Sequence, residues 1–264
     1  MMKRLIYQVY TGKRSKLYDH CTSSVKEYAN RIGADYICQR QPILMIKPDV
    51  FQTNRNPRAW EQYGGFLPIF EKENAFTYLR SYDQIAIIDA DVWIRPECND
   101  SLFEEVGTKV DFSASIERDM PITPQYKKKI ANYSREQYGM TPLNKLFDWK
   151  HPSGCGAEFR NMGVMVINKS LLNYLNGETP HQFLLRPRFK PFIDGLGNWK
   201  WSTDQTLLNV WIKEENMKVH DLHWKWNGLF TANTKIKECN FVHFFLKQKL
   251  PNNGENVNEL MGLI

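Results

Sequence analysis

The distribution of apolar and polar positions in the first part of the chain predicts a strand, a helix and a second strand. Residues 5–10 form a mostly apolar run of strand length, and residues 25–32 carry apolar side chains at helical spacing before Gly33. A second short apolar run covers residues 34–38. This order of elements predicts a parallel sheet with a ligand crevice above its first turn.

The middle of the chain predicts a helix, two strands and a long irregular segment. Residues 65–80 place aromatic and aliphatic side chains at helical spacing, while 110–116 and 163–167 are short apolar runs typical of strands. Residues 117–160 are polar and show no regular period. We therefore expect this segment to be a loop that rims a ligand site.

The most informative pattern is a continuous apolar run that ends at two aspartates. Residues 85–88 are all apolar, as expected for a strand that is covered on both faces. Asp89 and Asp91 follow it, and in extended chain two such side chains point to the same side. Two carboxylates at the carboxyl end of a buried strand suit a hard divalent cation, and ligands bind at that end of α/β sheets.

Composition limits the class of protein without choosing a function. The chain has 264 residues, of which 42% are hydrophobic and 13% aromatic, so one substantial core is expected. The 35 Lys and Arg residues exceed the 29 Asp and Glu residues by six, which is compatible with anionic small molecules, acidic membrane surfaces or nucleic acid. The basic residues form no dense stripe and match no nucleic-acid-binding motif, so nucleic acid is not an expected partner.

Cysteine usage and hydropathy indicate a reducing compartment. The five cysteines are scattered, odd in number and never spaced as Cys-x-x-Cys, so neither a disulfide framework nor a zinc knuckle is expected. The chain begins with too short an apolar stretch for a signal peptide and contains no run of about 18 apolar residues. We expect a cytoplasmic protein without a transmembrane segment, and the basic excess leaves peripheral contact with a membrane open.

Four later segments must be considered together with the acidic pair. All of them carry polar residues beside apolar or aromatic ones: 161–168, 201–211, 226–227 and 241–249. An Asp-x-Asp after a strand, then Asn-x-Gly-Val-Met-Val, then Asp-Gln at a helix start and a late His-Phe together resemble the metal-dependent nucleotide-sugar glycosyltransferases of the GT-A fold. The similarity is greatest to the retaining group that includes glycogenin and bacterial lipopolysaccharide galactosyltransferases. The resemblance implies one α/β domain over residues 1–250, with a Rossmann-like, mixed and mainly parallel sheet flanked by helices, and a polar C-terminal tail at 251–264.

The resemblance also assigns roles to individual residues. It places Mn²⁺ or Mg²⁺ on Asp89, Asp91 and His243, and it implies that Asp204 and Gln205 hold the sugar hydroxyls and the reacting face. The remaining donor contacts that it implies involve Tyr10, Thr11, Lys72, Asn161, Gly163 and Lys249. The implied activity is transfer of a hexose from a nucleotide-sugar, UDP-sugars first, to a saccharide or glycan acceptor. We expect acceptor choice to lie in residues 117–160.

Two positions depart from the pattern of this family. Lys72 stands where the bacterial members carry arginine, which keeps the charge but loses the bidentate fork. Leu246 replaces the glycine expected three residues after His243, although Lys249 supplies the basic residue expected six after it. The resemblance favours retention of configuration, whereas an inverting enzyme needs a base such as Glu158 or Asp194.

Each motif also has a local interpretation. Ser202 with Gln205 forms a capping-box pattern, with Asp204 in the positive first turn of the helix. Gly163 permits tight packing, and His243 lies among apolar neighbours as a core histidine would. Two other functions stay open: a haloacid-dehalogenase-type phosphohydrolase, whose nucleophile motif is also Asp-x-Asp after a strand, and a non-catalytic protein that binds nucleotide-sugars or carbohydrate. The first alternative lacks a downstream Gly-Asp-x-x-x-Asp pair.

Overall fold

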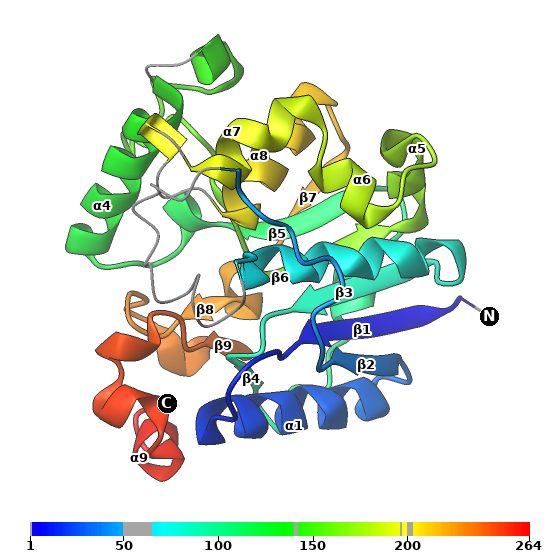
Figure 1. Cartoon of the computed structure of the whole chain (residues 1–264). Helices are drawn as coiled ribbons and strands as arrows, with labels where there is room; N and C mark the ends of the chain where they lie inside the picture. Colours follow the sequence, from blue (N-terminus) through cyan, green and yellow to red (C-terminus); the bar gives the residue numbers. More distant parts are fainter. Residues whose placement is uncertain (1, 50–64, 140–141, 196, 200–202) are drawn as a thin grey trace.

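The computed structural model describes residues 2–49, 65–139, 142–195, 197–199 and 203–264 (Figure 1). Its main sheet has six strands in the order β2-β1-β3-β6-β5-β7. Their bounds are β1 (Arg4–Val9), β2 (Asp35–Gln39), β3 (Gln84–Ile88), β5 (Phe112–Ile116), β6 (Arg160–Asn168) and β7 (Val219–Asp221). β6 is antiparallel to both of its neighbours, and the other neighbouring pairs are parallel. The predicted mixed and mainly parallel sheet is confirmed.

Helical segments connect and cover the strands. The α-helices are α1 (Lys16–Arg31), α3 (Leu102–Val106), α4 (Pro124–Ser134), α5 (Leu172–Leu175), α6 (Pro180–Leu184), α7 (Lys190–Asp194), α8 (Asp204–Glu214) and α9 (Val257–Met261). Shorter or differently wound helical segments are η1 (Pro68–Arg80), η2 (Glu117–Asp119), η3 (Arg135–Gly139), η4 (Pro142–Leu146), η5 (Lys169–Leu171), η6 (Pro187–Phe189), η7 (Gly197–Trp199), η8 (Trp224–Trp226), η9 (Ile236–Glu238), η10 (Lys247–Lys249) and η11 (Pro251–Gly254).

Both faces of the sheet are covered, because successive side chains of β1 enter two different hydrophobic layers. Leu5 and Tyr7 pack in the layer that contains apolar residues of η1, α6 and α8. Ile6 packs in the layer that contains residues of α1 and α3. Figure 1 shows α1 on one side of the sheet and α6 and α8 on the other. All five residues of β3 are buried, as its apolar run predicts.

The helix predicted over residues 65–80 is present as η1, but it is a 3₁₀ helix rather than an α-helix. Long 3₁₀ helices are uncommon because their hydrogen bonds are poorly aligned. Polar side chains of η1 are held by distant backbone instead: the buried Glu71 carboxylate accepts hydrogen bonds from the N–H groups of Ile43, Leu44 and Met45. These contacts fix η1 against the loop after β2.

The prediction of an irregular segment at 117–160 is wrong for its central part, which forms α4. Thr123 caps this helix by accepting a hydrogen bond from the Tyr126 N–H, and Pro124 occupies its first turn. Among its residues only Ile130 and Ser134 are buried. The apolar period was therefore too weak to indicate a helix.

A second sheet has three short strands in the order β4-β9-β8: β4 (Val92–Ile94), β8 (Gly228–Leu229) and β9 (Phe241–His243). β9 is antiparallel to β4 and pairs His243 with Val92. This pairing brings the end of the chain to the residues that follow β3. The sequence did not predict these strands, because two or three residues carry no measurable period.

Residues 251–264, expected as a polar tail, form η11 and α9 in the structure. Leu260 of α9 is fully buried in one hydrophobic cluster with Leu17 and Cys21 of α1. Glu255 accepts hydrogen bonds from the Ser15 hydroxyl (2.9 Å) and the Lys16 N–H (3.1 Å) at the start of α1. These contacts join the segment to the first helix, and the domain boundary at residue 250 stays a prediction.

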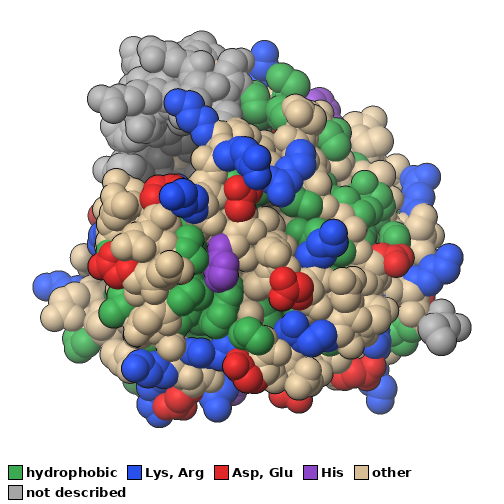
Figure 2. All heavy atoms as spheres, turned by 90° about the horizontal axis from the view of Figure 1, so that it is seen from below, with side chains coloured by type: hydrophobic (Ala, Val, Ile, Leu, Met, Phe, Trp, Pro, Cys, Tyr) green, Lys and Arg blue, Asp and Glu red, His purple; other side chains and the backbone are tan. Residues whose placement is uncertain are grey.

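The face of the molecule seen in Figure 2 carries charges of both signs. Figure 2 shows the face on which α1 lies, where Lys and Arg side chains alternate with Asp and Glu. Within the described ranges, no helix is both long and apolar enough to cross a membrane. The cytoplasmic location stays a prediction.

Candidate active site

Asp89 and Asp91 lie in a tight turn between β3 and β4, not in extended chain. The Val92 N–H donates to the Asp89 carbonyl oxygen (3.1 Å), which closes the turn. The expectation that strand alternation aligns the two carboxylates is therefore wrong. They converge because the turn reverses the chain at the carboxyl end of β3.

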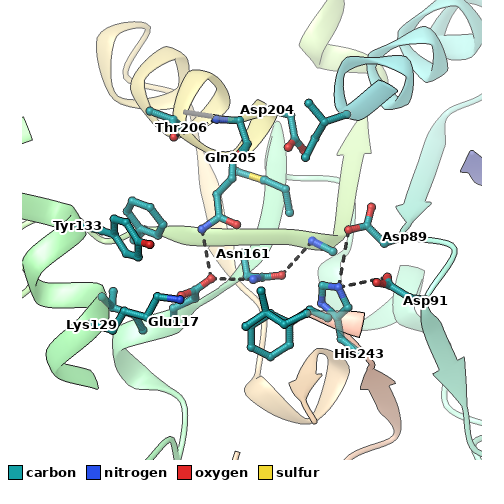
Figure 3. A pocket seen from close by; sticks show the side chains of 18 of the residues that line it. Asp89, Asp91, Glu117, Lys129, Tyr133, Asn161, Asp204, Gln205, Thr206 and His243 are labelled. Atoms are coloured by element: carbon teal, nitrogen blue, oxygen red, sulfur yellow. Dashed lines mark hydrogen bonds and ion pairs between the residues drawn. The ribbon is translucent and has the colours of Figure 1, made fainter. Parts of the chain in front are cut away.

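His243 completes a cluster with the two aspartates (Figure 3). Its Nε2 atom lies 3.3 Å from an Asp91 oxygen and 3.8 Å from an Asp89 oxygen. The three potential ligand atoms all lie within 4.8 Å of one another. Two carboxylates and one imidazole form a donor set that suits Mn²⁺ or Mg²⁺ better than a soft metal.

The orientation of the His243 ring is set by a chain of amide hydrogen bonds. The Gly163 N–H donates to Oδ1 of Asn161 (3.0 Å), so that atom is an acceptor and also receives a bond from Nδ2 of Asn227 (2.8 Å). Oδ1 of Asn227 then faces Nδ1 of His243 (3.1 Å), which must carry the proton. Nε2 is thereby directed at the aspartates. Such support of a histidine is typical of metal sites.

Burial and charge act against each other in this cluster. Burial lowers the pKa of His243, but Asp91 and Asp89 raise it above its ordinary value. Burial also raises the pKa of Asp91, yet His243 holds it below its ordinary value. The pKa of Asp89 is raised by burial, against the influence of Lys72. The charges of His243 and Asp91 thus stabilise each other against the cost of burial.

Gly163 makes room for the histidine. A Cβ atom at this position would lie 2.3 Å from Cε1 and 2.4 Å from Nδ1 of His243. The absence of a side chain at Gly163 thus serves close packing against the imidazole, as its local interpretation proposed. Its predicted contact with the donor sugar stays a prediction.

Gly163→Ala is expected to displace the His243 ring and weaken divalent metal binding about tenfold or more, with a loss of about 1–3 kcal/mol in the free energy of unfolding. Metal titration and denaturant unfolding measure the two effects. Gly139→Ala is the matched control, because a Cβ there meets its nearest neighbour, Trp149, at an ordinary 3.6 Å. Equal metal affinity in the two variants would contradict this role for Gly163.

Lys72 lies between two carboxylates. Its buried ammonium is 2.8 Å from an Asp89 oxygen and 2.8 Å from an Asp204 oxygen, and it donates to the Met162 carbonyl oxygen (3.0 Å). Burial would lower the pKa of Lys72, but Asp204 and Asp89 raise it above its ordinary value. Lys72 thus joins the acidic pair to the start of α8, which the sequence did not predict.

Asp204 and Gln205 begin α8, as predicted. The N-cap is Thr203, whose N–H donates to the Thr206 hydroxyl (3.4 Å), while Ser202 lies outside the described residues. The Asp204 side chain is buried against Lys72. Nε2 of Gln205 donates to a Glu117 carboxylate oxygen (3.2 Å).

Glu117 is the residue that sequence reasoning missed. It follows β5 and is buried, and its carboxylate accepts hydrogen bonds from Asn161 (2.7 Å), Gln205 (3.2 Å) and Tyr126 (3.4 Å). Burial raises its pKa although these donors oppose the shift. The sequence contained a signal for Glu117, because this acid comes directly after a predicted strand. Such a residue lies at the same edge of the sheet as Asp89.

Two cavities meet at the acidic pair. The larger, about 430 Å³, is lined by polar groups of the cluster and of α8, including Asp89, Asp91, His243, Asn161, Asp204 and Gln205. The second, about 280 Å³, is lined by Tyr10 and Thr11 and shares Lys72, Asp89 and Asp91 with the first. The predicted site residues that follow β1 and β3 are thus brought together with those of η1, β6, α8 and β9. Their roles stay predictions.

Lys249 is the exception among the predicted site residues. It is exposed on η10 and lines neither of these two cavities. Leu246, just before η10, has φ +58° and ψ 55°, a left-handed conformation that costs a non-glycine residue roughly 1–2 kcal/mol. The leucine thus keeps a backbone shape typical of glycine while its side chain lines the larger cavity. The predicted diphosphate contacts of this segment stay untested.

No protein-family model matches the sequence, and no curated protein matches it. Three solved structures resemble the chain with a TM-score of 0.49 each. One is a glycosyltransferase involved in glycosylation of the major capsid of PBCV-1, with 14% identity over 99% of this chain and 100% of that chain. Another is mouse xyloside xylosyltransferase 1, with 13% identity over 95% and 100%. The third is the galactosyltransferase LgtC in complex with donor and acceptor sugar analogues, with 16% identity over 91% and 87%.

All three structures are glycosyltransferases, the class that the sequence motifs resemble. At such low identity, these similarities say nothing about the substrate of this chain.

Proposed function

We propose that the chain is a metal-dependent glycosyltransferase that moves a hexose from a UDP-sugar to a saccharide or glycan acceptor with retention of configuration. The observation that supports this most strongly is that Asp89 and Asp91, which form a potential metal site with His243, line both cavities. A nucleotide-sugar has two parts joined by a diphosphate. The cluster lies where that diphosphate would bind, with one cavity for each part.

The donor set fits the metal that the proposal requires. Asp89 and Asp91 supply hard oxygen ligands, and the hydrogen bond from Nδ1 of His243 to Asn227 leaves Nε2 free to bind. When bound, Mn²⁺ or Mg²⁺ would supply Lewis-acid stabilisation of the negative charge on the leaving diphosphate.

The remaining residues would bind and orient the sugar. Nε2 of Gln205 donates to Glu117, which would leave the amide oxygen of Gln205 to contact the sugar. Figure 3 shows Gln205 and Asn161 between Glu117 and the cluster. An amide oxygen close to the anomeric carbon would stabilise the positive charge that develops there. Glu117 would be a positioning residue for Gln205.

Retention follows the family resemblance, and the two carboxylates named above as examples of an inverting base, Glu158 and Asp194, are both ion-paired. The Glu158 carboxylate is paired with Lys213 (2.6 Å) and Arg160 (3.0 Å), and Asp194 is paired with Lys190 (2.8 Å). Neither residue lines the larger cavity. Paired carboxylates outside the cavity are poorly placed to activate an acceptor.

The test is a screen of UDP- and GDP-sugars for nucleotide release with Mn²⁺, Mg²⁺ or a chelator. We expect release from at least one UDP-sugar in the presence of Mn²⁺, and none with the chelator. Phosphate release from simple phosphomonoesters would instead support the phosphohydrolase. Binding of donor and acceptor without turnover across the panel would favour the non-catalytic protein.

A further inference from the structure

One face of α4 forms a wall of the larger cavity. Tyr126, Lys129, Ile130 and Tyr133 all line it, and they are spaced as residues on one helix face. Lys128, on another face of the helix, is exposed and does not line the cavity. The wall combines aromatic rings with one positive charge.

This wall lies at the end of the cavity opposite the metal-binding cluster. Figure 3 shows Asp89, Asp91 and His243 on one side, Asn161 and Gln205 in the middle, and Lys129 and Tyr133 on the other side. The second cavity shares the aspartates and is lined by Tyr10 and Thr11, but by no residue of α4. If the donor spans the aspartates as proposed, the space beside α4 is left for the acceptor.

Lys129 lacks a carboxylate partner among the described residues, whereas Lys72 in the same cavity has two. Its ammonium lies 5.4 Å from the Tyr133 ring centre and 6.0 Å from that of Tyr126. The nearby Glu117 carboxylate already accepts three hydrogen bonds. Burial and the nearby Lys249 lower the pKa of Lys129, and the nearby Glu117 carboxylate only partly opposes this shift.

We infer that the acceptor is a saccharide with an anionic group, a carboxylate or a phosphate, which binds Lys129 while the sugar ring packs against the tyrosines of α4. Aromatic rings suit the apolar face of a sugar, and an ammonium forms strong charge-assisted hydrogen bonds with either anion. This inference rests on the proposed function and specifies its acceptor class.

The experiment compares matched acceptors with the full chain and the donor that the screen identifies. Transfer rates are measured for glucose against glucuronic acid, and for glucose against glucose 6-phosphate, in wild type, Lys129→Met and Lys128→Met. We expect kcat/KM to be about tenfold higher for an anionic acceptor than for glucose in wild type and in Lys128→Met. Lys129→Met should reduce the ratio of kcat/KM for the anionic acceptor to that for glucose to near one. Comparison of the glucuronic acid pair with the glucose 6-phosphate pair distinguishes recognition of a carboxylate from recognition of a phosphate.

The outcomes distinguish this inference from the proposed function. Transfer without any preference for anionic acceptors, or a preference that Lys129→Met leaves intact, would overturn the inference and leave the function standing. A Lys129-dependent preference for donors with a uronic acid would place the anion on the donor and also overturn it. If no donor turns over, direct titration of the same saccharides still tests it: anionic ligands must bind more tightly than glucose, and Lys129→Met alone must remove the difference.

Discussion

Asp91→Asn is expected to lower metal-dependent nucleotide release about 1,000-fold, because a bound metal contributes several kcal/mol to the transition state and about 1.4 kcal/mol is a factor of ten. The substitution removes one of two carboxylates in a three-ligand set. Initial rates with the active donor and a Mn²⁺ titration measure the effect. Unchanged activity would reject the metal assignment.

The same variant is expected to fold almost normally, within about 1 kcal/mol of wild type. Asparagine has the shape of aspartate, and the Asp91 carbonyl oxygen keeps its hydrogen bond from the Phe244 N–H (2.8 Å). Asp100→Asn is the matched control, since Asp100 is exposed just before α3 and lines neither cavity of the candidate site. A large loss of stability in Asp91→Asn would mean that the carboxylate is mainly structural.

Lys72→Met is expected to reduce the free energy of unfolding by about 3–5 kcal/mol near neutral pH without metal, because it leaves two carboxylates without their shared partner. The Asp204 side chain is only 3% exposed and that of Asp89 26%, so water replaces the lysine poorly. Denaturant unfolding followed by circular dichroism measures the change. Lys26→Met on the exposed face of α1 is the control and should alter stability by less than about 0.5 kcal/mol.

The loss in Lys72→Met should depend on pH in a defined direction. Burial already raises the pKa of Asp89, and Lys72 is the largest influence that opposes this shift. Without Lys72 that pKa rises further above its value in the unfolded chain. A carboxyl group with a higher pKa in the folded state favours folding where it is protonated, so the deficit should be smaller at about pH 5 than at about pH 8. A deficit that grows on acidification would contradict the ion-pair explanation.

The local features of the site were available from the sequence. The apolar run of β3 and the two acids after it predicted a buried strand that ends at a ligand site, and the structure has that strand between two covered faces. The β1–α1–β2 order was equally clear. These features depend on residues that are neighbours in the chain, and short-range periodicity reports such neighbours directly.

Features that depend on weak local signals were missed or predicted incorrectly. α4 has few buried residues, so its sequence resembled a loop, although its half-buried face forms a cavity wall. The aspartates were expected in extended chain, whereas a turn brings them together. In each case the local secondary-structure propensity allowed more than one conformation, and contacts with other elements selected one of them.

The sequence by itself determined the α/β class, the first strands and the position of the acidic pair after a buried strand, because each follows from adjacent residues. Only the tertiary structure decided which distant groups meet there. The pairing of β4 with β9 places His243 beside Asp91, and η1 places Lys72 between Asp89 and Asp204. These contacts between distant residues depend on the register of short strands and on packing across the sheet. Neither of these produces a periodic pattern of apolar residues in the sequence.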